Sequence, residues 1–447
     1  MVNIKIPDGA TEIIDRIRLH KHIAYVVGGC VRDSLLGKEP KDWDICTSAT
    51  PDQIKEILSS YKILDTGLQH GTVTVVTTDG GYEVTTFRVD GRYSDGRHPD
   101  TVEFVLSLYD DLSRRDFTVN AMAFNPSVGL IDYFGGEKDL RDRVLSCVGK
   151  PHERFQEDAL RILRALRFSS VYGFRIKDTT SQAIHTHSDL LKNVAPERIN
   201  SELCKLLLGD SSSEVLLEYS DVISKIIPQL SPCIGFDQNN RFHQYTVYEH
   251  IVRAVENYPG QDLVTKLTLL LHDIGKPRCY TEDEKGGHFR GHGVVSRDIA
   301  EQVLADLRFD NKTKQQVTEL VLYHDSTIAP TEKAVKRWLN KIGEEQFLRL
   351  LDVKMADIFA HRRETQEDRI SEVQKVRILT TKVLAEKQCF SIKDLAINGC
   401  DLIDLGIQEG PRIGELLAGA LGEVIEGTLE NVSEVLLDWI SELTDGL

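Results

Sequence analysis

The feature that most restricts the fold of this chain is a change of sequence pattern near residue 136. Upstream of it, short runs rich in β-branched and aromatic residues are separated by turns of Gly, Asp and His: AYVVGG, DWDIC, TVTVVTT, YEVTTFRV and TVEFVLS. From about residue 137, apolar residues recur at helical spacing, and strand-like runs are nearly absent after residue 150. We therefore expect an N-terminal α+β domain followed by an all-helical remainder.

Local signals refine this plan. Residues 1–20 predict an amphipathic helix, and residues 157–168 predict one strong helix. Pro196 is expected in the first turn of a further helix, where its missing N–H costs nothing. Repeated glycines after Leu395 indicate a small helical lobe at the end of the chain.

Composition sets wide limits on function. The hydrophobic fraction of 41% is ordinary for a globular protein, so the chain can bury a core. The net charge of −16 by itself argues against a nucleic-acid partner. A local basic groove can still form on an acidic protein, because affinity depends on nearby phosphate contacts. Basic clusters do occur, although solvated surface charge is the simpler interpretation of each residue: Arg88, Arg92, Arg97, Arg114, Arg115, Arg154, Arg161, Arg164 and Arg167.

The chain has no run of about eighteen apolar residues, so we expect no membrane span. Its beginning, MVNIKIPDGATEIIDRI, carries early acids and lacks the apolar segment of a signal peptide. The eight cysteines are scattered without a C-x-x-C pair, which is typical of reduced thiols. These features together predict a cytoplasmic protein.

The stretch GGCVRDSLLGKEPKDWD, residues 28–44, carries the densest chemistry. Gly28 and Gly29 let the backbone approach a phosphate closely, because no Cβ intervenes. Asp42 and Asp44 are spaced i and i+2, so on a strand they would share one face. Adjacent carboxylates repel each other unless a cation lies between them. A D-x-D pair alone is weak evidence, but the arrangement suits Mg²⁺ held against nucleotide phosphates.

Further residues are candidates for the same site. Glu83 is expected on a neighbouring strand, where it is either a third carboxylate or an exposed strand residue. Arg114 and Arg115 lie just before a predicted strand-to-helix junction, and their guanidinium groups can donate paired hydrogen bonds to phosphate oxygens. Asn120 follows close behind and could contact the sugar or a phosphate.

Asp158 and Arg161 lie three residues apart in the predicted helix over 157–168, so they should share a face. An intrahelical ion pair is the simpler interpretation of this spacing. The alternative is base recognition. Asp accepts a hydrogen bond and Arg donates one, so the two together can address the Watson–Crick edge of C or A without a template strand.

Taken in order, these motifs resemble those of class II tRNA nucleotidyltransferases, the CCA-adding enzymes of the poly(A) polymerase-like family. The segments are GGCVRD…KDWD, TGLQHGTVTVV, EVTTFR, YSDGRHPDTVEF, RRDFTVNAMA, EDALRILRALRF and PERINSEL, which span residues 20–210. The resemblance implies template-independent addition of C, C and A to the 3′ end of tRNA from CTP and ATP. It implies an α+β nucleotidyltransferase head followed by an all-α neck, body and tail, at residues 1–140, 141–210, 211–385 and 386–447.

The resemblance also implies roles for individual residues. Asp42 and Asp44 would bind two Mg²⁺ ions, with Glu83 assisting. Contacts to the triphosphate and the incoming nucleotide would come from Gly28, Gly29, Arg32, Arg114 and Asn120. The base would be recognised by a set of three residues: Asp158, Arg161 and, in support, Arg164.

Three alternatives remain at this point. Bacterial poly(A) polymerases share the head but usually carry a more basic segment after the first motif, and GLQHGT at 67–72 matches the CCA-adding pattern better. Relatives that add only CC lack a flexible loop after EVTTFR, whereas this chain keeps one at 88–99, which favours CCA addition or addition of A alone. An RNA-binding protein with a decayed transferase is disfavoured, because every carboxylate of the site is present.

The helical remainder holds a second constellation of His and Asp residues. Imidazoles with carboxylates suit divalent transition metals or Mg²⁺. Any single histidine here is more often structural, but the ordered set resembles the HD-domain phosphohydrolases. The resemblance implies one metal held by His250, His272, Asp273 and Asp357. It leaves His292 and His324 for a second metal or a phosphate, and His243 and His288 have no place in it.

The resemblance implies metal-dependent hydrolysis of a phosphoester at this second site, independent of the transferase. The substrate guess, a 2′,3′-cyclic phosphate or a 2′-phosphate, comes from the resemblance alone. The identity of the metal and the oligomeric state stay open. The alternative is that the domain acts only as a structural brace in the tRNA-binding body.

Overall fold

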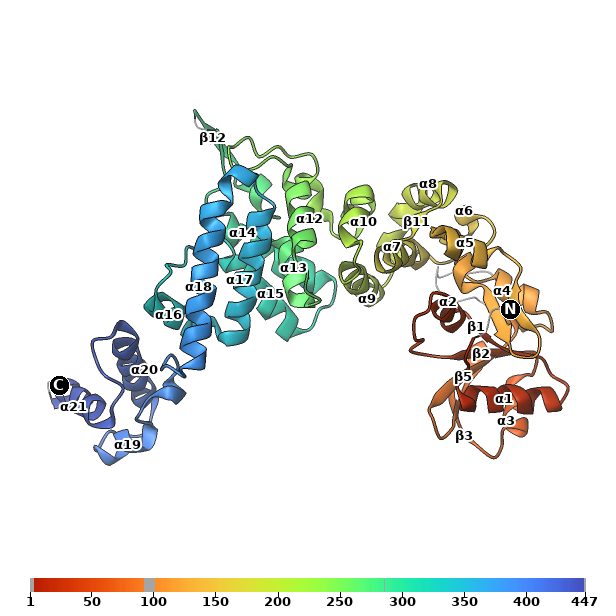
Figure 1. Ribbon diagram of the computed structural model, residues 1–447, viewed down its shortest axis with the longest axis horizontal. Helices are drawn as coiled ribbons and strands as arrows, with labels where there is room; N and C mark the ends of the chain where they lie inside the picture. The colour runs from red at the N-terminus through yellow and green to blue at the C-terminus, as the bar shows by residue number, and fades with distance from the viewer. Residues whose placement is uncertain (1–3, 92–100, 285, 446–447) are drawn as a thin grey trace. The chain divides into compact units, whose positions relative to one another are not determined.

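The computed structural model describes residues 4–91, 101–284 and 286–445 and divides the chain into two compact units, Met1–Pro228 and Gln229–Leu447 (Figure 1). The boundaries predicted at 140, 210 and 385 each fall inside one of these units, so the four-part division remains a prediction. Among the described residues, no helix combines the length and apolar character needed to cross a bilayer. All eight cysteines are free thiols, as their spacing predicts.

The first unit is built on a seven-stranded mixed sheet in the order β3-β4-β5-β2-β1-β8-β9. Strands β2 and β5 run parallel, and the other neighbours are antiparallel. The segments predicted as strands are confirmed, whereas β3, β8 and β9 were not predicted. The strands of this sheet are β1 (Ala24–Val27), β2 (Asp44–Thr47), β3 (Lys62–Gly67), β4 (Thr72–Val76), β5 (Gly81–Thr86), β8 (Met122–Asn125) and β9 (Gly129–Asp132).

Short helices cover this sheet. Helices α1 and α3 lie side by side against it, and α1 buries Ile13, Ile14 and Ile17 as its amphipathic pattern predicts (Figure 1). The helices of this part are α1 (Asp8–Leu19), α2 (Gly29–Leu35), α3 (Pro51–Ile57), α4 (Leu108–Ser113) and α5 (Gly136–Asp142), with the short helices η1 (Leu68–His70) and η2 (Thr118–Asn120). The predicted loop over 88–99 begins with β6 (Arg88–Asp90), which pairs with β7 (Val102–Phe104), but residues 92–99 lie outside the described residues.

Helices also complete the first unit. They are α6 (Pro151–Glu157), α7 (Leu160–Tyr172), α8 (Asp178–His187), η3 (Ser188–Asn193), α9 (Pro196–Leu207), α10 (Ser212–Glu218) and α11 (Ser220–Ile226). A two-stranded parallel pairing joins β10 (Val144–Leu145) to β11 (Arg175–Ile176). Pro196 occupies the first turn of α9, as predicted.

The single helix predicted over 157–168 is wrong. Helix α6 ends at Glu157 and α7 begins at Leu160, with Asp158 in an extended conformation at φ −142° and ψ 105°. The carboxylate of Asp158 accepts a hydrogen bond from the backbone N–H of Leu160 at 3.0 Å. Such a local side-chain bond competes with the helical hydrogen bonds. Asp158 and Arg161 therefore do not share one helix face.

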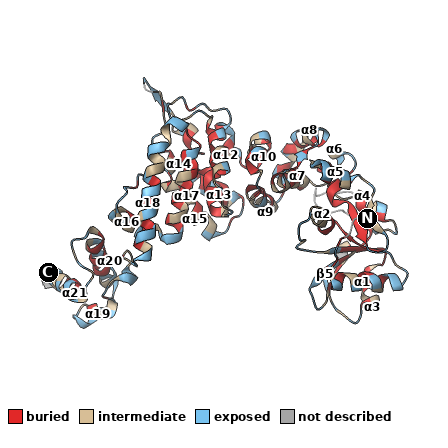
Figure 2. Cartoon of the chain, in the orientation of Figure 1, coloured by how far each residue is buried: buried red, intermediate tan, exposed pale blue. Residues whose placement is uncertain are grey.

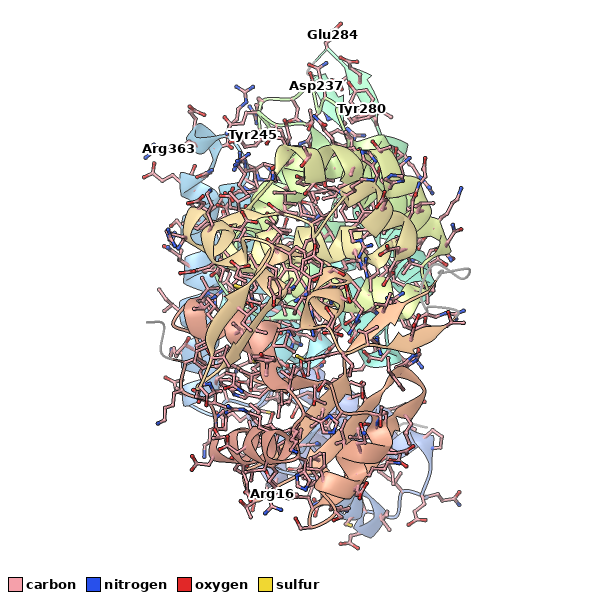
Figure 3. All side chains as sticks on the ribbon, turned by 90° about the vertical axis from the view of Figure 1, so that its right-hand side faces the viewer. Arg16, Asp237, Tyr245, Tyr280, Glu284 and Arg363 are labelled. Carbon is pink, nitrogen blue, oxygen red and sulfur yellow. The ribbon has the colours of Figure 1, made fainter. Side chains whose placement is uncertain are left out.

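The second unit is helical. Its first part comprises η4 (Pro228–Cys233, which begins one residue before the unit), α12 (Val247–Asn257), α13 (Leu263–Leu271), η5 (Lys276–Arg278), the hairpin β12 (Thr281–Asp283) and β13 (Gly286–His288), α14 (His292–Asp306), α15 (Asn311–Tyr323), α16 (Glu332–Ile342), α17 (Glu344–Phe359), η6 (Arg363–Thr365) and α18 (Glu367–Ala385). Helix α13 is buried along nearly its whole length, and α12, α15 and α17 pack around it (Figure 2). Exposed charged side chains include Asp237, Glu284 and Arg363 (Figure 3).

The end of the second unit has a hydrophobic cluster of its own. The cluster includes the fully buried Leu402, Leu436 and Ile440. The helices that contribute to it are α19 (Gly399–Asp404), α20 (Pro411–Glu426) and α21 (Ser433–Asp445), and the short helix η7 (Ile392–Asp394) precedes them.

Candidate functional site

A cavity of about 470 Å³ opens in the first unit. Every residue predicted to bind the nucleotide lines it: Gly28, Gly29, Arg32, Arg114, Asn120, Asp158, Arg161 and Arg164. Asp44 lies at the same cavity. Arg115, a phosphate-binding candidate from the sequence, also lines it, and five further lining residues were not predicted for the site: Asp116, Leu160, Arg167, Phe168 and Arg198. The lining holds seven arginines and three aspartates, an excess of positive charge that suits a triphosphate.

Two of the three predicted carboxylates are positioned by neighbouring strands. Asp44 is the first residue of β2, and Glu83 on β5 lies directly opposite it in parallel register. Asp42 lies before β2, so the expectation that both aspartates share a strand is wrong for Asp42. The oxygen atoms of these three carboxylates do not all lie within 4.8 Å of one another. Among the described residues, groups of three or more potential ligands that close are found only in the second unit.

The carboxylates nevertheless influence one another. Loss of hydration raises the pKa of Asp44, and the negative charges of Glu83 and Asp42 raise it further. Arg115 acts in the opposite direction and lowers it. A bound cation would relieve this repulsion, as expected for a metal site.

Gly28 is required by its conformation. Its φ of +81° lies where side chains are rarely tolerated, and a Cβ there would lie 3.0 Å from Nη1 of Arg115. The glycine therefore keeps the backbone before α2 close to that guanidinium group. We expect Gly28→Ala to destabilise this turn by about 1–3 kcal/mol and to raise the KM for the nucleotide substrate that the sequence resemblance implies. Thermal unfolding and steady-state kinetics measure the two effects, and Gly37→Ala, at a positive-φ glycine with no nearby atoms, is the matched control for backbone strain.

A polar network fixes the arginines of this cavity. Nη1 of Arg32 donates to Oδ1 of Asn120 at 2.6 Å, and Nδ2 of Asn120 donates to Asp116 at 3.1 Å. Nε of Arg164 donates to the other oxygen of Asp116 at 2.8 Å. Burial alone would raise the pKa of Asp116, but Arg164 and Asn120 outweigh it and hold that pKa at about 2. Asp116 therefore stays ionised and positions Asn120 and Arg164. This role was not predicted from the sequence, although Asp116 lies in the RRDFTVN motif.

The predicted pair of Asp158 and Arg161 is not an ion pair. Asp158 instead pairs with Arg198 of α9, with 2.8 Å between Oδ2 and Nη2. Arg161 pairs with Glu157 at 2.6 Å and donates to the carbonyl of Arg114 at 3.2 Å. The simpler interpretation of the spacing is thus wrong, and both side chains still line the cavity.

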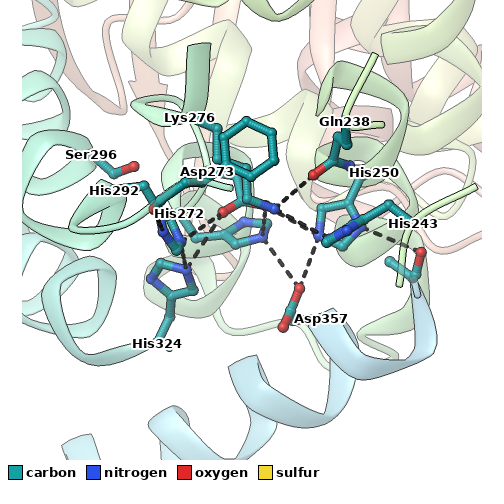
Figure 4. Close-up of polar contacts among 12 residues, drawn as sticks. Gln238, His243, His250, His272, Asp273, Lys276, His292, Ser296, His324 and Asp357 are labelled. Carbon is teal, nitrogen blue, oxygen red and sulfur yellow. Dashed lines mark hydrogen bonds and ion pairs between the residues drawn. The ribbon is translucent and has the colours of Figure 1, made fainter. Parts of the chain in front are cut away.

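A second site lies in the second unit, where five elements bring the predicted His and Asp residues together (Figure 4). His250 comes from α12, His272 and Asp273 follow α13, and Asp357 comes from α17. These four residues place donor atoms within 4.8 Å of one another. The distance from Nε2 of His250 to Oδ1 of Asp357 is 2.9 Å.

A second donor group shares one residue with the first. Asp273, His292 and His324 also lie within 4.8 Å of one another. Nε2 of His292 is 3.3 Å from Oδ1 of Asp273 and 3.0 Å from Nε2 of His324. Asp273 therefore lies between two candidate metal positions, with one oxygen toward each.

Backbone carbonyls orient the imidazoles. Nδ1 of His272, His292 and His324 lies 2.8, 2.8 and 2.7 Å from the carbonyl oxygens of Leu269, Phe289 and Val321. A carbonyl only accepts, so Nδ1 carries the proton and Nε2 faces the cluster. This is the outer contact that metal-binding histidines usually make. Nε2 of His272 is buried and lies 3.2 Å from Oδ2 of Asp273, as two ligands of one metal ion would.

The charges of the cluster also fit a cation. Burial alone would lower the pKa of His272, but Asp273 and Asp357 raise it to about 10. Histidine and lysine neighbours hold the pKa of Asp273 well below its usual range despite its burial. Without metal, a proton on His272 thus balances the carboxylates, and metal binding would displace it.

Four residues beside the cluster were missed. Nζ of Lys276 lies 2.6 Å from Asp273 and 3.3 Å from Nε2 of His243. His361 packs its ring against His243 at 4.4 Å between centroids, and Nη2 of Arg369 is 3.6 Å from Asp357. His243, which had no place in the pattern, therefore lies in the site. His288 lines the same cavity of about 450 Å³.

Comparisons with known proteins agree with the first site. Residues 24–146 match the family model "Poly A polymerase head domain". Residues 173–234 match "Probable RNA and SrmB- binding site of polymerase A", and residues 294–440 match a model of tRNA nucleotidyltransferase domain 2.

Whole-chain relatives are CCA-adding enzymes. The chain is 34% identical to that of Levilactobacillus brevis over 410 residues, which is 91% of each protein. It is 48% identical to that of Ligilactobacillus salivarius over 224 residues, a match that spans 49% of this chain and 55% of the relative. The solved CCA-adding enzyme of Bacillus stearothermophilus in complex with CTP is 30% identical, with a TM-score of 0.72 over 98% of this chain and 97% of that one.

Proposed function

This chain belongs to the family of CCA-adding enzymes, and we propose that it adds C, C and A to the 3′ end of tRNA without a template, using CTP and ATP. The relative from Levilactobacillus brevis, aligned over 91% of both chains, supports the assignment. The observation that carries it is that one arginine-rich cavity is lined by all eight residues predicted to bind the nucleotide. We also propose a cytoplasmic location, which the eight free thiols support.

The reaction would be in-line attack of the tRNA 3′-OH on the α-phosphate, with pyrophosphate as the leaving group. We propose that Asp42, Asp44 and Glu83 hold Mg²⁺, which when bound neutralises charge on the reacting phosphate. The guanidinium groups of Arg32, Arg114 and the other lining arginines would bind the triphosphate.

Assays with tRNA that lacks its 3′ CCA test this function. We expect CTP alone to extend the tRNA by two residues, and CTP with ATP to extend it by three. A poly(A) polymerase would instead extend it repeatedly with ATP alone. An enzyme that adds only A would act on tRNA ending in CC and would ignore CTP.

Base choice is proposed to depend on Asp158 and Arg161, each held by a partner. Arg198 orients Asp158 and Glu157 orients Arg161, so the two polar edges are arranged before the nucleotide arrives. We expect Asp158→Ala or Arg161→Ala to relax nucleotide choice more than it slows chemistry. Each substitution should cost about 1–3 kcal/mol of discrimination between bases, because the base loses its hydrogen-bond partner on the protein and is left unpaired in the cavity.

Incorporation of UMP and GMP beside CMP and AMP measures this change. Arg198→Ala should have the same direction of effect, because Asp158 loses its partner. Arg175→Ala is the matched control, since Arg175 pairs with Asp178 on the surface of the same unit. Unchanged selectivity in all three site variants would mean that these pairs only stabilise the fold.

We propose that the second site is a metal-dependent phosphohydrolase of the HD type. The sharing of Asp273 by two donor groups supports a pair of metal ions. His250, His272, Asp273 and Asp357 would hold one ion, and Asp273, His292 and His324 the other. The ions, when bound, would lower the pKa of a water molecule and stabilise charge on the phosphoryl group. The abundance of imidazoles favours a transition metal.

A further inference from the structure

One phenylalanine contacts three of the arginines that line the cavity of the first unit. Phe168 belongs to α7, lines that cavity and is 3% exposed. The Cζ atoms of Arg167, Arg32 and Arg164 lie over its ring, at 4.0, 5.0 and 5.6 Å from the centroid. At these distances a guanidinium group is attracted to the electron-rich face of an aromatic ring. The ring is therefore a common contact of side chains that reach it from α2 and from α7.

Three cations around one ring repel one another unless other groups offset their charge. Nε of Arg32 lies 2.9 Å from Oδ1 of Asp33, and Nε of Arg167 lies 2.6 Å from Oε2 of Glu202. Asp116 pairs with the third guanidinium group at 2.7 Å. These carboxylates come from three separate segments of the chain, whereas the ring of Phe168 contacts all three guanidinium groups.

Arg167 is the arginine that lies closest to the ring, and it is poorly hydrated. Loss of hydration lowers the pKa of its guanidinium group even though Glu202 is beside it. The attraction between a cation and an aromatic face is larger at such a desolvated site than in water. The ring of Phe168 therefore stabilises a charge that water no longer hydrates.

Other aromatic rings hold Phe168 in place. Phe117 meets it edge-on, with centroids 5.6 Å apart and an angle of 79° between the planes, and Tyr172 stacks on it at 5.9 Å. The ring centroid of Tyr172 also lies 4.8 Å from Cζ of Arg32, and its hydroxyl donates to Asp33 at 2.9 Å. The ring of Phe168 is therefore a fixed surface, and the arginines over it are arranged before a nucleotide arrives.

We propose that Phe168 is a positioning residue for the transferase: its ring gathers three arginines of the cavity into the arrangement that binds the triphosphate. The inference rests on the proposed function of this cavity. Phe168 is too buried to bind the nucleotide itself, so it acts through the arginines. Loss of the ring should then weaken nucleotide binding and leave the chemical step nearly unchanged.

Removal of the aromatic face in the full chain tests this role. Phe168→Met keeps a long apolar side chain that can fill the space of the ring. We expect it to raise the KM for CTP by roughly tenfold, because three cation–π contacts are lost, and to change kcat less than about twofold. Phe168→Tyr keeps the ring and should restore the KM. An unchanged KM in Phe168→Met, a loss confined to kcat, or a KM that Phe168→Tyr does not restore would each overturn the proposal.

Phe155→Met is the matched control, because Phe155 is a fully buried phenylalanine on α6, and the cation–π contacts among the described residues do not include it. It should lose stability with the KM for CTP unchanged, and thermal unfolding verifies that each variant is folded.

Binding of inorganic tripolyphosphate, measured by isothermal titration calorimetry, separates the two claims because it needs neither tRNA nor a base. If wild-type protein adds no CMP to tRNA, the proposed transferase function is wrong. The role of Phe168 still stands if Phe168→Met weakens tripolyphosphate binding, and it is overturned if the binding matches that of wild type.

Discussion

Replacement of Asp44 by alanine is expected to lower the rate of CMP addition to tRNA by roughly a thousandfold or more. Asp44 begins β2 at the edge of the arginine-rich cavity, and Glu83 lies opposite it on β5. Burial and the like charges of Glu83 and Asp42 raise the pKa of this carboxylate, so its removal relieves repulsion in the folded protein. Its removal should therefore abolish the transferase and leave the fold intact.

Single-turnover addition of CMP to tRNA without its 3′ CCA measures the effect. Asp42→Ala should act in the same direction, because Asp42 lies next to Asp44 and raises its pKa. Asp65→Ala is the matched control, since Asp65 is a half-exposed aspartate on β3 of the same sheet. Near-normal incorporation by Asp44→Ala would show that the metal site lies elsewhere.

Asp273→Asn should produce the second large effect, a loss of phosphoester hydrolysis by roughly a thousandfold or more with CCA addition unchanged. Asp273 belongs to both of the donor groups proposed to hold a metal ion, so one substitution weakens both. Asparagine keeps the shape of the side chain and removes only the charge. His292→Ala, in contrast, should remove one metal position and leave the other.

Metal content by mass spectrometry accompanies the assays with Mg²⁺, Mn²⁺, Ni²⁺ and Co²⁺. We expect Asp273→Asn to lose both ions and His292→Ala to lose one. Asp44→Ala should keep hydrolysis, because the two sites lie in different units. Failure of wild-type protein to hydrolyse any cyclic or monoester nucleotide with all four metals would favour the structural brace.

Sequence reasoning found the elements whose signals are local. Strands such as β4, with TVTVV, carry the β-branched residues that a half-buried strand prefers. Strand β3, KILDTG, is mostly exposed at the edge of the sheet and lacks that signal. The break between α6 and α7 was missed because the apolar periodicity of the sequence continues across it. The break is associated with the hydrogen bond from the Leu160 N–H to the Asp158 side chain, which a pattern of apolar residues does not reveal.

The sites show the same division. The ordered motifs identified residues that line the two cavities, because each motif is short and its spacing is fixed. Partners that only the fold brings together were missed. Arg198 reaches Asp158 from 40 residues away, and His243 approaches Lys276 from 33 residues away. Neither separation has a spacing rule that a sequence could reveal.

The carbonyl contacts of the imidazoles tie the second site to the ends of its helices. His272 and His324 directly follow α13 and α15. Each ring is oriented by the hydrogen bond that its Nδ1–H donates to the backbone carbonyl three residues before it. The last helical turns thus preorganise the ligands, so that less conformational entropy is lost when a metal ion binds. Metal affinity and helix-end order then form one linked equilibrium, in which binding opposes fraying and fraying weakens binding by the same free energy. Amide hydrogen exchange at these two helix ends would consequently report metal occupancy.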